Sequence, residues 1–231
     1  ASLVEDGSTL QLGIGAIPDA ALLFLKDKKN LGIHSEMISD GVLDLVKSGV
    51  INNKAKNFHT GKMIVTFVMG TKALYDYVDN NPLVEFHPVD YVNNPIIIAN
   101  NDKMISINSC VQIDLTGQIC SESIGYNQIS GVGGQVDFVR GATMSRGGKS
   151  IIAIPSTAAK GKISRIVSVL DEGAIVTTSR NDVDYIVTEY GIARLKGKTL
   201  KERGRVLIGI SHPDFRDELI NIWEERYRCK F

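Results

Sequence analysis

The sequence has few cysteines, no excess of charge and no long hydrophobic run. Its 231 residues include three cysteines, an odd number with no CxxC spacing, which disfavours a disulfide framework and predicts a reducing, cytoplasmic location. Lys plus Arg equals Asp plus Glu at 26 each, so the basic footprint of a nucleic-acid-binding protein is absent. No apolar run approaches the ~20 residues of a membrane-spanning helix, and we expect no membrane partner.

Histidine is also scarce, and its spacing does not indicate a metal site. The four histidines are scattered, with no pair three or four residues apart, so we predict no bound metal. They are His34, His59, His87 and His212. The sequence begins without Met or a signal-peptide pattern, and residues 1–7 resemble the end of a helix. We therefore expect the chain to begin within a longer protein.

Hydrophobic residues make up 43% of the chain, and their spacing alternates between strand and helix patterns. We expect strands at 9–13, 31–36, 62–69, 84–87, 104–115, 118–123, 150–155, 163–170, 174–178 and 184–188, helices at 19–29, 42–47, 71–78, 199–210 and 213–228, and loops at 89–95 and 130–138. The alternation predicts an α/β fold with an open, mostly parallel sheet covered by helices. A hairpin turn at Thr116-Gly117 makes the predicted sheet mixed.

Residues 31–41 carry the candidate on which the functional hypothesis depends. They read as a short apolar strand that ends in Glu36, followed by Asp40 as the N-cap of a helix. Ligands of open α/β sheets bind beyond the carboxyl ends of the strands, which is where Glu36 is expected. The alternative is a solvent-exposed loop glutamate, because charged residues are mostly exposed.

Two glycine-rich segments accompany this carboxylate. Gly13-Ile14-Gly15 leads from a strand into a helix, and Gly131, Gly133 and Gly134 lie in the predicted loop at 130–138. Bare backbone N–H groups in such turns can hold an oxyanion, while a carboxylate can attack a thioester carbonyl. Each segment alone is also compatible with an ordinary tight turn or a surface loop.

Five motifs together resemble a known family. They are LGIGAIP at 12–18, HSEMISDG at 34–41, GVGGQVDF at 131–138, TEYGIA at 188–193 and HPDFR at 212–216. The chain resembles the C-terminal half of family I CoA-transferases of the acetyl-CoA hydrolase/transferase group, with most likeness to the 4-hydroxybutyrate and butyrate:acetate CoA-transferases. The resemblance covers nearly the whole chain, so residues 1–231 are expected to form the C-terminal catalytic domain.

The resemblance implies a ping-pong transfer of CoA between short-chain carboxylic acids such as 4-hydroxybutyrate or butyrate and acetate. Glu36 would be the nucleophile and would form a glutamyl-CoA thioester, with coenzyme A entering as the acyl-CoA substrate. The implied CoA-binding positions are Gly13, Ile14, Gly15, Ala16, Ile17, Val111, Gly133, Gly134 and Lys160, with Lys162 as a rival to Lys160. Asn93 matches a loop near the active site.

The resemblance also implies partners beyond this chain. Family members carry a preceding α/β domain that contributes to the acyl pocket, and they form homo-oligomers. We therefore expect acyl-CoA, carboxylates, that N-terminal domain and further copies of the chain as partners. Two alternatives remain: an acyl-CoA hydrolase on the same scaffold, and a non-catalytic CoA-binding half.

Overall fold

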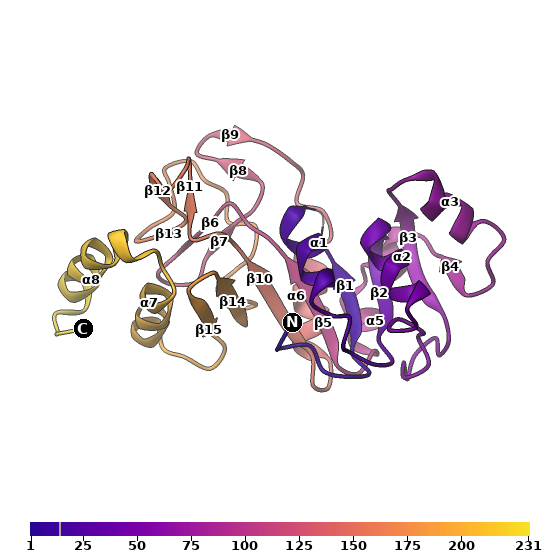
Figure 1. Cartoon of the computed structure of the whole chain (residues 1–231). Coiled ribbons are helices and arrows are strands. Elements are labelled where there is room, and N and C mark those ends of the chain that lie inside the picture. The colour runs from indigo at the N-terminus through magenta and orange to yellow at the C-terminus, as the bar shows by residue number, and fades with distance from the viewer. Residues whose placement is uncertain (14) are drawn as a thin grey trace. The chain divides into compact units, whose positions relative to one another are not determined.

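The computed structural model describes residues 1–13 and 15–231, which divide into two units. The first unit contains Ala1–Asn108 and Asp137–Ser150, and the second contains Ser109–Val136 and Ile151–Phe231. Figure 1 shows the elements of both units along the chain.

The first unit is built on five parallel strands in the order β5-β1-β2-β3-β4. They are β1 (Thr9–Leu12), β2 (Gly32–Ile38), β3 (Met63–Val68), β4 (Val84–Phe86) and β5 (Met104–Asn108). Parallel neighbours need crossover connections, and α1 (Ala16–Leu23), α2 (Asp40–Lys47) and α3 (Lys72–Val78) supply three of them. The strand order reverses at β1, because β2 lies on one side of it and β5 on the other. The carboxyl end of β1 is thus a topological switch point.

One face of this sheet is covered by α4 (Val89–Val92), α5 (Pro95–Ala99) and α6 (Gln135–Met144). A buried cluster joins the three helices to β3 and β5, and it consists of Ile64, Val92, Ile98, Met104, Phe138 and Ala142. Side chains alternate between the faces of a strand, so His34, Glu36 and Ile38 of β2 point to one side. His34 stacks edge-on against Phe138, which places this side towards α4 and α6.

The second unit uses short strands and two long helices. Its strands are β6 (Gln112–Asp114), β7 (Ile119–Cys120), β8 (Ser123–Ile124), β9 (Asn127–Gln128), β10 (Lys149–Ala153, which starts in the first unit), β11 (Thr157–Ala158), β12 (Ile163–Ser164), β13 (Ile166–Val167), β14 (Tyr185–Thr188) and β15 (Gly191–Arg194). Its helices are α7 (Leu200–Gly209) and α8 (Pro213–Tyr227). The buried Trp223 of α8 packs against Gly204 of α7, where a Cβ would approach the indole to 2.5 Å.

The fold class predicted from the sequence is confirmed. The five strands of the first unit are parallel, β10 and β14 are parallel, and β14 and β15 are antiparallel. The Thr116-Gly117 hairpin is present between β6 and β7, although it belongs to a separate small sheet in which β6 also pairs with β13.

Some local predictions were wrong. The strand expected at 104–115 is interrupted after β5, the loop at 89–95 contains α4, and 174–178 forms one isolated bridge through Thr178. The loop expected at 130–138 becomes α6 from Gln135 onward, because Phe138 and Ala142 gain a buried cluster that outweighs the weak local helix signal.

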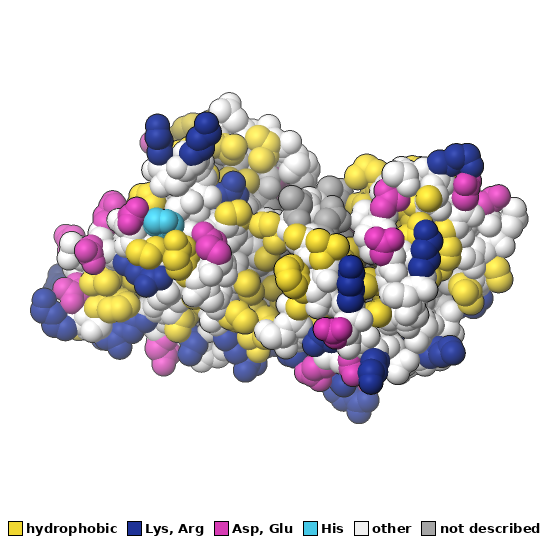
Figure 2. Space-filling model, in the orientation of Figure 1, with side chains coloured by type: hydrophobic (Ala, Val, Ile, Leu, Met, Phe, Trp, Pro, Cys, Tyr) yellow, Lys and Arg dark blue, Asp and Glu magenta, His cyan; other side chains and the backbone are white. Residues whose placement is uncertain are grey.

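Charge is distributed as the composition suggests. On the face drawn in Figure 2, basic and acidic side chains are interspersed between hydrophobic ones. Among the described residues, no helix is both long enough and apolar enough to span a membrane.

Candidate active site

Glu36 lies on β2 beside the end of β1. The two strands pair only at Thr9 with Gly32 and Leu10 with Ile33, whereas β3 pairs with β2 as far as Ile38. Glu36 is therefore inside a strand rather than at its end, because β3 keeps β2 extended for two further residues. Its side chain is half-buried, at the switch point where ligands of such sheets bind.

Asn93 holds the carboxylate of Glu36. The Asn93 amide Nδ2 donates a hydrogen bond of 2.9 Å to Glu36 Oε2, and Asn93 is 9% exposed. Asn93 caps the C-terminus of α4, so the position of that helix determines where the amide points. This contact places Asn93 beside the candidate nucleophile, as the sequence predicts. The other carboxylate oxygen, Glu36 Oε1, takes no part in the bond.

His34 lies on the same face of β2 as Glu36 and contacts the end of α4. Its Nε2 lies 2.9 Å from the Val92 carbonyl, one residue before Asn93. Burial lowers the pKa of His34 to about 4, so the ring is neutral near pH 7. The neutral tautomer that carries its proton on Nε2 donates to Val92, and a fully buried ring thereby fixes the end of α4.

Asp137 is an acidic neighbour that the sequence analysis did not identify. It lies in the first turn of α6. Burial raises its pKa, Arg140 opposes that shift, and the nearby charge of Glu36 raises it further. The candidate site thus pairs two carboxyl groups of like charge, a pattern typical of functional sites. No sequence signal indicated this, because Asp137 was expected in a loop.

The turn after β1 has a crowded and specific geometry. A Cβ on Gly13 would lie 2.8 Å from Asn108 Oδ1, so only glycine fits there. The Gly13 N–H already donates to the Ile107 carbonyl at 2.7 Å, which leaves its carbonyl and Cα for other contacts. Gly15, at φ 126°, precedes α1, which begins at Ala16. Ile17 is half-buried in that first turn, and Ile14 lies outside the described residues.

Ser35 joins this turn to β2. Its hydroxyl accepts from the Leu12 N–H at 3.3 Å and donates to the Met37 carbonyl at 2.7 Å. These two hydrogen bonds connect the end of β1 to the residues of β2 immediately before and after Glu36.

Asp40 does not cap α2 as predicted. The helix begins at Asp40 itself after Ser39, and the Asp40 carboxylate instead accepts hydrogen bonds from the N–H and hydroxyl of Thr71. The reason is tertiary: the turn between β3 and α3 reaches the first turn of α2, and Gly70 leaves room for this approach.

The remaining predicted residues belong to the second unit. Gly133, with φ 58°, is exposed, and Gly134 is buried. Val111 lies just before β6, and its N–H donates to the Cys120 carbonyl at 2.8 Å, so this N–H is already engaged. Lys160 is exposed at the turn between β11 and β12, where Ala159 and Lys160 both adopt positive φ.

A second carboxylate, Glu189, lies in the turn between β14 and β15. It accepts a hydrogen bond of 2.9 Å from the Ser156 N–H and one of 2.5 Å from the Ser156 hydroxyl. Burial would raise the pKa of Glu189, but hydrogen bonds from Ser156 and from its own backbone N–H, together with the nearby His212, lower the pKa overall. The TEYGIA motif thus contributes a turn that is fixed to the end of β10.

Comparison with known proteins supports the predicted family. The 4-hydroxybutyrate coenzyme A transferase of Clostridium kluyveri is 72% identical to this chain. The match covers 98% of this chain and 53% of that protein. RipA from Yersinia pestis superposes with a TM-score of 0.93 at 49% identity, over 98% of this chain and 51% of that protein. A 4-hydroxybutyrate CoA-transferase from Porphyromonas gingivalis gives 0.86 at 52% identity, over 98% and 53%.

The chain therefore spans about half the length of the relatives that it matches. Residues 70–222 match the profile of the acetyl-CoA hydrolase/transferase C-terminal domain, and likeness to the individual relatives extends over nearly the whole chain. The chain belongs to the acetyl-CoA hydrolase/transferase family, in which it corresponds to the C-terminal half.

Proposed function

We propose that this chain is the catalytic C-terminal half of a CoA-transferase in which Glu36 is the nucleophile. The observation that carries the proposal is the placement of Glu36: half-buried at the switch point of a parallel sheet, with one carboxylate oxygen held by Asn93. The similarity to 4-hydroxybutyrate and butyrate:acetate transferases supports short-chain carboxylic acids as substrates.

The reaction follows from the chemistry of a carboxylate and a thioester. Glu36 attacks the acyl carbonyl of an acyl-CoA, and CoA thiolate leaves as an acyl-glutamyl anhydride forms. The thiolate then attacks the glutamyl carbonyl, which releases the first acid and yields a glutamyl-CoA thioester. An incoming carboxylate reverses both steps and leaves as the new acyl-CoA.

In this proposal the turn after β1 receives the thioester end of CoA. The backbone around Gly13, Ile14, Gly15, Ala16 and Ile17 lines that end, and free N–H groups at the start of α1 stabilise the oxyanion. One such donor is typically worth about 3 kcal/mol of transition-state stabilisation.

The second unit supplies the remaining contacts with CoA in this proposal. On the family likeness alone, we assign backbone contacts with CoA to Val111, Gly133 and Gly134 and a phosphate contact to Lys160. Lys160 and its rival Lys162 are both exposed, which leaves their charges available to an anionic ligand.

The decisive experiment looks for the covalent intermediate. The chain, together with the preceding half that its relatives possess, is incubated with butyryl-CoA and digested for mass spectrometry. We expect the mass of CoA on the peptide that contains Glu36, its loss in Glu36→Gln, and its retention in Asp44→Asn, which alters an exposed carboxylate of α2. An unmodified peptide, or a Glu36→Gln variant with full activity, would reject the proposal.

The same assay separates the alternative functions. Thioester loss that does not require an added carboxylate indicates the hydrolase, which the family description includes. Binding of CoA without turnover, even in the presence of the preceding half, indicates a non-catalytic module.

A further inference from the structure

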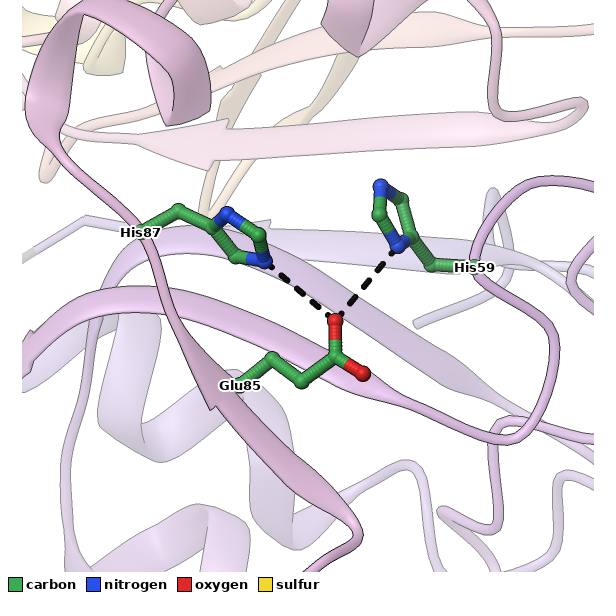
Figure 3. Close-up of side chains that lie close together, drawn as sticks. All are labelled: His59, Glu85 and His87. Carbon is green, nitrogen blue, oxygen red and sulfur yellow. Dashed lines mark hydrogen bonds and ion pairs between the residues drawn. The ribbon is translucent and has the colours of Figure 1, made fainter.

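Two of the four histidines that are scattered in the sequence come together in the fold. His59 lies in the segment before β3, Glu85 lies on β4, and His87 follows that strand. In the part of the chain that the structure describes, their ligand atoms all lie within 4.8 Å of one another. Figure 3 shows both imidazole rings directed at the same oxygen of Glu85.

We propose that His59, Glu85 and His87 form a binding site for a divalent transition metal of the zinc type. The inference concerns the first unit alone and does not depend on the proposed transferase activity.

The distances between the donor atoms suit a single small ion. Glu85 Oε2 lies 3.2 Å from His87 Nε2 and 3.6 Å from His59 Nδ1. Zn²⁺ binds nitrogen and carboxylate oxygen at about 2.0–2.2 Å, which puts tetrahedral ligands roughly 3.4 Å apart. The 3.6 Å separation is longer than a hydrogen bond, so this pair is arranged better for a shared cation than for a direct bond.

The surroundings of the rings are those of metal ligands. His59 Nε2, the nitrogen that faces away from Glu85, lies 2.7 Å from the Tyr91 hydroxyl. A ligating histidine usually donates its second N–H to such a partner, which fixes the tautomer with Nδ1 free for the metal. Tyr91 also stacks on His87 at 4.8 Å between ring centroids, so one side chain orients both imidazoles.

The charged groups of the cluster indicate which class of metal ion it can bind. Glu85 is the single carboxylate of the cluster, and Lys62 lies 3.5 Å from its other oxygen, Oε1. Ca²⁺ and Mg²⁺ depend on several oxygen ligands, whereas two imidazoles and one carboxylate suit Zn²⁺, Co²⁺ or Ni²⁺. The three side chains are 22–35% exposed, which leaves a path for the ion and a fourth position for water.

The test titrates the full chain with Zn²⁺ by calorimetry and with Co²⁺ by visible spectroscopy. We expect one ion per chain and a Co²⁺ ligand-field band. His59→Gln and His87→Gln should each abolish both signals, and Tyr91→Phe should weaken binding by roughly tenfold, because it removes the hydrogen bond between the Tyr91 hydroxyl and His59 Nε2. His212→Asn, which changes a histidine of the second unit and keeps an N-capping side chain on α8, should bind as the wild type does.

Thermal unfolding guards against variants that simply fail to fold. Saturating Zn²⁺ should raise the Tm of the wild type and of His212→Asn, but not of a His87→Gln variant whose metal-free Tm is unchanged. If His87→Gln does not fold, Tyr91→Phe provides a second comparison, because at a fixed, subsaturating Zn²⁺ concentration its Tm should rise by less than that of the wild type. Absence of one-to-one binding, or binding that persists in both His59→Gln and His87→Gln, would overturn the proposal.

Discussion

Glu36 and Glu189 lie in different units. Both carboxylates accept hydrogen bonds, but their surroundings differ in a way that bears on function. Glu36 accepts a side-chain hydrogen bond from Asn93 and has the like charge of Asp137 nearby. Glu189 accepts two bonds from Ser156 and has the favourable charge of His212 nearby. Hydrogen bonds to a carboxylate stabilise its charge and thereby reduce its tendency to attack a carbonyl. The comparison teaches that Glu189 holds a turn, whereas Glu36 Oε1 lies outside the bond to Asn93, as the proposed role of a nucleophile requires.

The largest expected effect concerns the buried imidazole under the Glu36 site. The pKa of His34 is lowered to about 4, so the unfolded chain binds its proton first as the pH falls from about 6.5. Its contribution to stability is complete above pH 6.5 and is lost towards pH 4, by about 3 kcal/mol. We expect urea unfolding at several pH values to show this loss in the wild type and a shallower dependence in His34→Gln.

His212→Asn is the matched control for that measurement and should retain the wild-type pH dependence. If His34→Gln and the wild type lose stability in parallel between pH 6.5 and 4, the assigned role of His34 is wrong.

A smaller effect is expected from altering the group that holds Glu36. Asn93→Asp replaces the amide donor with a like charge of the same shape, which displaces the Glu36 carboxylate and disfavours its ionised form. We expect kcat for CoA transfer, in the presence of the preceding half, to fall by roughly tenfold to 100-fold. The KM for acyl-CoA should change little, because Asn93 contacts the nucleophile.

The neighbouring Asn94 offers a sharp control. Its side chain N-caps α5 by accepting from the Ile96 N–H, a role that aspartate also performs. Asn94→Asp should therefore transfer CoA at the wild-type rate. Equal rates for Asn93→Asp and the wild type would contradict the role given to the amide.

The smallest effect is expected at Glu189. Because its folded pKa is lowered, its contribution to stability is present above the unfolded value near 4.3 and is lost as the pH falls through the folded pKa. Glu189→Gln should lower the free energy of unfolding at pH 7 by about 1 kcal/mol, a figure reduced for solvent exposure. The difference from the wild type should vanish near pH 3, as followed by chemical denaturation. A difference that persists there would show that charge is not the cause.

Local signals in the sequence were sufficient for several elements. The helix expected at 199–210 is α7, because Thr199 and Glu202 form a reciprocal capping box within four residues. The helix expected at 213–228 is α8, which begins at Pro213 because the fixed φ of proline suits the first turn of a helix. The parallel strands β1, β3 and β10 were recognisable as apolar runs between turn residues.

Features that depend on contacts between residues far apart in the chain could not be predicted from the sequence. The bond from Asn93 to Glu36 joins positions 57 residues apart, and the loop likeness alone did not give its geometry. Helix α6 was missed because its stability comes from a cluster shared with α4, α5 and two strands. His59 and His87 were judged by their spacing along a helix, whereas the sheet brings them together from separate segments.

The sequence by itself determined the α/β class, the position of Glu36 on a strand and the family to which its motifs belong, because strand and helix periods and turn residues are local properties. The tertiary structure alone decided that β2 continues past Glu36, that Asn93 and Asp137 lie near its carboxylate, and that His59, Glu85 and His87 converge. The physical reason is that pairing with β3 and burial against α4 and α6 act between segments far apart in the chain, where no local pattern records them.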